Sequence, residues 1–189
     1  MRATASGQST ALLLDIVDQL VREKIDYAVV GAMAAAVHGV IRATADADAV
    51  LLLPVQQAAA LRRRFVAAGF RAQLQRGDSM DPIQAMLTVD DDFRNRVDLL
   101  IGVQGLEVAA FGRALSIPFN GASLRIMGRE DFIAMKAFAG GPQDLADASA
   151  ALIAADSGID LPLLRRLTER YGRDASAALD RLLAENNVG

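Results

Sequence analysis

Asp46 and Asp48 stand one residue apart at the start of an expected strand that continues into the apolar run 49–53. Side chains two residues apart on a strand lie on the same face, so the two carboxylates point the same way. Neighbouring carboxylates at the mouth of a buried strand repel each other unless a cation binds or one takes a proton. The spacing therefore predicts a divalent metal site at this end of the strand.

A third aspartate, Asp98, lies inside a strand expected over residues 96–102. Its neighbours Val97, Leu99 and Ile101 occupy one face of that strand, and Asp98 lies on the other. A carboxylate in so apolar a strand is costly without a partner. It can pair with an arginine, such as Arg96 or Arg42. Because the Asp46/Asp48 pair is present as well, we favour the interpretation of Asp98 as a third metal-binding carboxylate.

Composition limits the chemistry that is available. The chain has 189 residues, of which 52% are hydrophobic and 23% charged, which suits one domain, or one domain with a small appendage. The net charge of −3 argues against sequence-independent nucleic-acid binding as the main role. The absence of cysteine and the single histidine, His38, exclude thiolate and histidine-rich metal sites. Oxygen ligands favour Mg²⁺ or Mn²⁺.

The most apolar segment near the start of the chain, residues 11–21, is interrupted by Asp15 and Asp18. Its apolar residues follow the spacing of one helix face. We therefore expect that this segment is neither a signal peptide nor a membrane span. We also expect the protein to be cytoplasmic.

The elements around the aspartates follow from periodicity and turn residues. Ser9 or Thr10 is expected to cap a first helix that runs to about residue 24. A strand over 27–30 leads into a glycine turn at Gly31 and a short helix of small residues. The free N–H groups at the start of that helix can receive an anion; a plain tight turn is the alternative.

The patterns along the rest of the chain predict an α+β fold, in which a body of mixed strands and helices is followed by a C-terminal helical region. We expect a body over residues 1–129 and a helical region over 130–189. The periodicity predicts a helix over 55–68 that faces Leu61, Phe65 and Val66 inward. After it we expect a strand over 70–75 and two paired strands over 85–89 and 96–102. A helix over 104–113, a hairpin at Asn120-Gly121 and four helices are expected over the rest of the sequence.

Three motifs resemble those of the nucleotidyltransferase superfamily, and most closely its minimal bacterial branch, which includes AbiEii-type toxins. They are Gly31-Ala32, Arg42-Ala-Thr44-Ala-Asp46-Ala-Asp48 and Val97-Asp98-Leu99-Leu100. The stretch 130–136, followed by Asp144 and Asp147, resembles the opening of the helical region in that branch. The resemblance covers residues 26 to about 153.

The resemblance implies a mixed sheet flanked by helices, with the three aspartates at one end. It also implies an enzyme that uses Mg²⁺ or Mn²⁺ and a nucleoside triphosphate. Asp46, Asp48 and Asp98 would then be the catalytic, metal-binding residues, with Asp98 accepting the proton of the acceptor. Nucleotide contacts would come from Gly31, Ala32, Arg42, Thr44 and Lys136, although Lys136 also fits an exposed helix face. Asp144 and Asp147 would touch the acceptor or Lys136, or would simply be solvated. His38 is interpreted as a helix-end hydrogen-bonding residue.

Two departures from the family pattern keep a second class of function open. Ala32 stands where the family usually has glycine or serine, and residues 140–143 lack the arginine that often precedes the Asp144-like residue. One hypothesis is an enzyme that transfers a nucleoside monophosphate to RNA, a protein side chain or a small molecule. The other is a weakly active or inactive relative that binds a protein partner, as a homodimer or in a toxin–antitoxin pair. A purely structural domain with salt-bridged aspartates is a third, less favoured interpretation.

Overall fold

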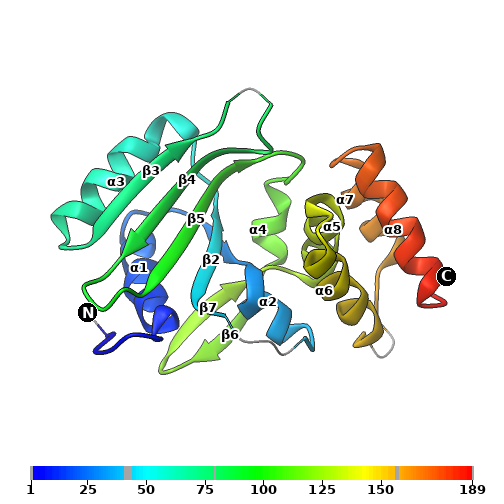
Figure 1. The fold of residues 1–189 in the computed structure, drawn as a ribbon, viewed down its shortest axis with the longest axis horizontal. Coiled ribbons are helices and arrows are strands. Elements are labelled where there is room, and N and C mark those ends of the chain that lie inside the picture. Colours follow the sequence, from blue (N-terminus) through cyan, green and yellow to red (C-terminus); the bar gives the residue numbers. More distant parts are fainter. Residues whose placement is uncertain (1, 41–43, 79, 156–157, 189) are drawn as a thin grey trace.

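A mixed sheet in the order β3-β4-β5-β2-β1-β7-β6 forms the centre of the molecule (Figure 1). The structure is a computed structural model that describes residues 2–40, 44–78, 80–155 and 158–188. Within these residues the strands are β1 (Tyr27–Val29), β2 (Asp46–Leu51), β3 (Arg71–Arg76), β4 (Ile83–Asp90), β5 (Arg96–Val103), β6 (Leu115–Phe119) and β7 (Ala122–Ile126). The pairs β2–β5 and β1–β7 are parallel, and the other neighbours are antiparallel.

Helices surround this sheet, and the last four gather beside one end of it (Figure 1). The helices are α1 (Ser9–Arg22), α2 (Gly31–Val37), α3 (Ala58–Ala67, after a 3₁₀ turn at Val55–Gln57), α4 (Ala109–Arg113), α5 (Arg129–Ala139), α6 (Pro142–Ile153), α7 (Leu161–Glu169) and α8 (Arg173–Glu185). The expected α+β fold with a C-terminal helical region is confirmed. The domain division at residue 129 stays a prediction. Over the described ranges, no helix combines the length and the apolar character that crossing a bilayer requires.

The two faces of the sheet differ in burial. On β5, Val97, Leu99 and Ile101 are fully buried, whereas Asp98 on the opposite face is partly exposed. β2 repeats this alternation over its first four residues, and α1 packs against both strands. The buried face is the core, so the aspartates lie on the face that α1 leaves open.

Three local expectations were wrong. Ser9 does not cap α1: its hydroxyl donates to the Ala45 carbonyl (2.6 Å) and accepts from the Arg96 N–H (3.1 Å), which ties α1 to the starts of β2 and β5. Val66 is 48% exposed, because Phe65 takes the inward position and the next helical residue is rotated by about 100°. The helix expected over 104–113 begins only at residue 109, because a turn with Gly105 at φ +81 precedes it.

Charged side chains connect the segment around α4 to the helical region. Arg113 makes two hydrogen bonds to the buried Asp131 of α5, at 2.8 and 2.7 Å. Glu107 forms an ion pair with Arg113 (2.8 Å) and accepts two hydrogen bonds from Arg166 of α7. This network fixes the position of α5, and α5 forms one wall of a pocket beside Asp48.

Candidate functional site

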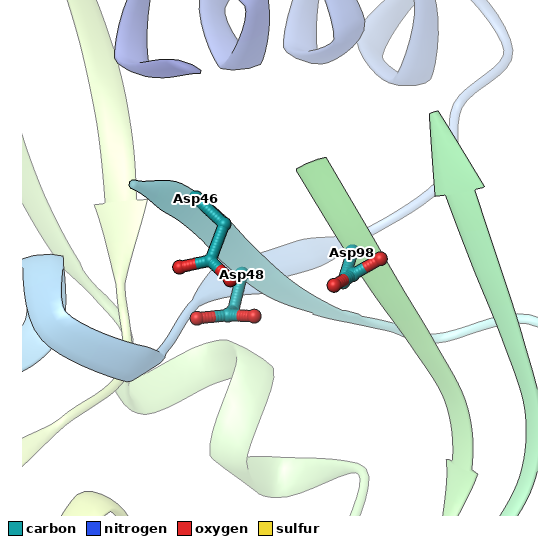
Figure 2. Close-up of side chains that lie close together, drawn as sticks. All are labelled: Asp46, Asp48 and Asp98. Atoms are coloured by element: carbon teal, nitrogen blue, oxygen red, sulfur yellow. The ribbon is translucent and has the colours of Figure 1, made fainter. Parts of the chain in front are cut away.

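Asp46, Asp48 and Asp98 converge on the open face of the sheet. The parallel register of β2 and β5 places Asp48 directly beside Asp98 (Figure 2). One carboxylate oxygen from each of the three residues lies within 4.8 Å of the other two. All three are partly buried, so their mutual repulsion is not fully screened by water. The arrangement can hold a divalent cation.

Threonine hydroxyls hold two of the three carboxylates in place, those of Asp46 and Asp98. Thr44 Oγ1 donates to Asp46 Oδ1 (2.7 Å), and Thr88 Oγ1 donates to Asp98 Oδ1 (2.6 Å). Thr88 lies opposite Asp98 in the antiparallel β4–β5 pair. Both bonds restrict rotation of a carboxylate before any ligand binds. The sequence alone does not indicate a role for Thr88, because that role depends on the register of the two strands.

Gly31 begins α2 next to the carboxylates. Its φ is +61, and a Cβ at this position would lie 2.0 Å from Asp48 Oδ2. The Val30 N–H also donates to the Asp48 carbonyl (2.9 Å), so the turn and β2 are held together. Glycine is therefore required here for its backbone conformation and for the space that Asp48 takes. Ala32, the next residue of α2, is buried.

A pocket of about 160 Å³ opens beside Asp48. Gly31, Asp48, Lys136 and Asp144 supply its polar lining. The rest of the lining is apolar and comes from β5, α5 and the residue that follows β1; these residues are Val30, Leu100, Phe132, Met135 and Ala139. The pocket thus brings together four of the predicted site residues. Of the other predicted site residues that the structure describes, none lines it; these are Asp46, Asp98, Ala32, Thr44 and Asp147.

Lys136 is held by two carboxylates from α6. Its Nζ lies 2.7 Å from Asp144 Oδ1 and 3.0 Å from Asp147 Oδ2, and its side chain is only 13% exposed. Asp147 is completely buried, and Gln143 Nε2 donates to its Oδ1 (2.9 Å). Lys136 therefore does not lie on an exposed helix face, and Asp147 is not solvated.

His38 follows the last residue of α2. Its Nε2 lies 2.8 Å from the Met127 carbonyl, to which it donates as the neutral ring, and its ring packs near Phe132. Burial lowers the pKa of His38 below its usual value. The interpretation of His38 as a helix-end hydrogen-bonding residue is confirmed. Arg42, predicted to contact nucleotide, lies outside the described residues.

No family model matches the chain, and no curated protein matches it by sequence. Solved structures do match it in fold. An antigenic nucleotidyltransferase-like protein from Paracoccidioides brasiliensis is 17% identical with a TM-score of 0.60, covering 98% of this chain and 92% of that one.

The antibiotic-resistance factor ANT(2'')-Ia is a second match in fold. Its solution structure is 14% identical with a TM-score of 0.58, covering 94% of this chain and 97% of that one. Its crystal structure in complex with adenylyl-2''-tobramycin is 13% identical with a TM-score of 0.57, covering 92% and 98%. These likenesses establish a nucleotidyltransferase-like fold along nearly the whole chain.

Proposed function

We propose that this protein is a metal-dependent nucleotidyltransferase, which moves a nucleoside monophosphate from a nucleoside triphosphate to an acceptor. The observation that carries the proposal is the convergence of Asp46, Asp48 and Asp98 beside a pocket lined by Lys136. Three carboxylates so close together suit a hard divalent cation such as Mg²⁺ or Mn²⁺, because such ions prefer oxygen ligands. The nucleotidyltransferase-like fold supports the same reaction.

In this proposal Asp46, Asp48 and Asp98 would hold two divalent ions. When bound, such ions neutralise charge on the phosphate oxygens during an in-line displacement. The acceptor oxygen forms a bond to the α-phosphorus. The bond from that phosphorus to the oxygen between the α- and β-phosphorus atoms breaks, and pyrophosphate leaves. Asp98 accepts the proton that the attacking group loses.

The remaining residues bind and orient the nucleotide. Lys136 pairs with a phosphate oxygen, and the backbone N–H groups of Gly31 and Ala32 donate to the phosphates. Arg42 adds positive charge at the triphosphate. Thr44 acts through Asp46, to which its hydroxyl is bonded.

A small molecule that carries a hydroxyl group is the acceptor we favour. ANT(2'')-Ia, which shares the fold over most of both chains, was solved with an adenylylated small molecule. The net charge of −3 is less suited to RNA. The toxin-like branch, a protein acceptor and a protein partner or homodimer stay predictions from the sequence alone.

Calorimetric titration of ATP, GTP, CTP and UTP with Mg²⁺ tests the proposal. The wild type should bind at least one nucleotide only when metal is present, and Asp46→Asn/Asp48→Asn should lose that binding. Asp180→Asn is a matched control, because Asp180 pairs with Arg165 through exposed side chains, between α7 and α8. Failure of every nucleotide to bind at millimolar concentration would overturn the proposal and favour the partner-binding alternative.

A further inference from the structure

We propose that Lys136 is held by one permanent carboxylate, Asp147, and one exchangeable carboxylate, Asp144, and that a triphosphate oxygen replaces Asp144 when nucleotide binds. Asp147 is then a positioning residue, and Asp144 is a residue that sets nucleotide affinity. The inference rests on the proposed function. It means that Asp144 competes with the phosphate of the nucleotide for Lys136.

The two carboxylates differ in how firmly they are fixed. The Asp147 side chain is 0% exposed, and Gln143 donates to its second oxygen. The Asp144 side chain is 30% exposed and lines the pocket beside Asp48. Separating a buried carboxylate from its cation leaves an uncompensated charge, whereas water can solvate an exposed one. Asp144 is therefore the partner that can leave.

The position of Asp144 in α6 also makes its release easier. It is the third residue of that helix, which begins at Pro142 after Gly141. The first turn of a helix favours a negatively charged side chain, because its N–H groups have no partner within the helix. Asp144 would thus keep a favourable environment after it has given up Lys136.

Charge balance at Lys136 favours such an exchange. Lys136 carries one positive charge between the two carboxylates of Asp144 and Asp147. A phosphate that approaches Lys136 while Asp144 stays in place would meet net negative charge. When Asp144 moves away, the ammonium group is available on the pocket wall, and Asp147 still fixes its position.

Two variants with the same charge change separate this arrangement from simple electrostatics. Asp144→Asn should tighten binding of Mg²⁺–tripolyphosphate, a probe that carries only the phosphate groups, by about two- to fivefold, the scale of a partly exposed ion pair. Asp147→Asn removes the same charge but should weaken that binding, because Lys136 loses its fixed partner. A uniform charge effect would strengthen binding in both.

A double-mutant cycle tests whether the gain passes through Lys136. Lys136→Met should weaken binding, and Asp144→Asn should give no gain in that background. Asp180→Asn, with its exposed ion pair on α7 and α8, should leave affinity unchanged. If Asp147→Asn does not fold, Gln143→Met decides the positioning role, because it removes the hydrogen bond to Asp147 without changing charge and should weaken binding.

Each result has a defined meaning. Unchanged or weaker binding in Asp144→Asn, or a gain that persists without Lys136, overturns the exchange while the proposed function stands. Unchanged affinity in both Asp147→Asn and Gln143→Met overturns the positioning role. If the folded wild type binds neither tripolyphosphate nor any nucleoside triphosphate with Mg²⁺, the proposed function fails, and the exchange fails with it.

Discussion

The carboxylate of Asp48 lies so close to the backbone of Gly31 that a Cβ at position 31 would clash with it unless the carboxylate moved. The added atom would be 2.0 Å from Oδ2, and the φ of +61 already disfavours other residues. This contact links the start of α2 to the carboxylate cluster. The position of the Asp48 carboxylate therefore depends on Gly31, although Gly31 has no side chain that could bind a ligand.

We expect Gly31→Ala to turn the Asp48 carboxylate away from Asp46 and Asp98. Binding of Mn²⁺ should weaken by about tenfold or more, as when a group that orients a metal ligand is lost. The left-handed backbone should add a stability loss of about 1–2 kcal/mol. Calorimetric Mn²⁺ titration and thermal unfolding measure the two effects.

Gly121→Ala separates backbone strain from the clash. Gly121 has a φ of +76, and nothing lies within 4 Å of an added Cβ. This variant should lose a comparable amount of stability and keep the Mn²⁺ affinity of the wild type. Equal Mn²⁺ affinities in the two alanine variants would contradict a role for the Gly31–Asp48 contact.

Thr88→Val should weaken metal binding although Thr88 is not expected to touch the metal. The substitution removes the hydroxyl that donates to Asp98 Oδ1 (2.6 Å) and keeps the side chain's shape. We expect a loss of about tenfold in Mn²⁺ affinity. Thr88→Ser, which keeps the hydroxyl, should restore most of it. Indistinguishable affinities in the valine and serine variants would show that the bond does not organise the cluster.

His38 should make the protein less stable as the pH falls. Burial lowers the pKa of His38 in the folded state, so the unfolded chain, with a pKa of about 6.5, binds the proton first. The free energy of unfolding should therefore decrease as pH drops below that value. Urea denaturation at pH 7.5 and 5.5 measures the change, and His38→Gln should reduce it. The same pH dependence in both proteins would assign it to other groups.

Glu107 should contribute stability that is lost only in strong acid. Hydrogen bonds from Arg166, and then from Arg113, lower the pKa of Glu107 from 4.5 to about 2. A depressed carboxyl pKa stabilises the fold above 4.5, and this contribution disappears as pH falls toward 2. Glu107→Gln should cost about 1–2 kcal/mol at pH 7, since Arg166 is half exposed and partly screened.

The control for Glu107 is Asp180→Asn, at an exposed ion pair. It should change stability by less than about 1 kcal/mol at pH 7. Thermal unfolding of both variants and the wild type between pH 7 and 2 tests the expectation. A difference between wild type and Glu107→Gln that does not shrink below pH 4.5 would contradict it.

Local patterns predicted the parts of the site that a single strand or helix defines. The two-residue strand repeat indicated that Asp46 and Asp48 share a face and that Asp98 opposes its apolar neighbours. Those expectations agree with the structure, because side-chain direction along a strand depends only on position in that strand. Helix ends were predicted less well. Ser9 does not cap α1, because its hydroxyl bonds to Ala45, just before β2, and to Arg96, the first residue of β5.

Only the tertiary structure decided which of these residues meet. The parallel register of β2 and β5 places Asp48 beside Asp98, and the register of β4 brings Thr88 to the same carboxylate. The packing of α6 on α5 gives Lys136 its two acidic partners. Each contact joins segments whose sequence patterns are independent, so strand order and helix packing, which the local patterns leave open, determine them.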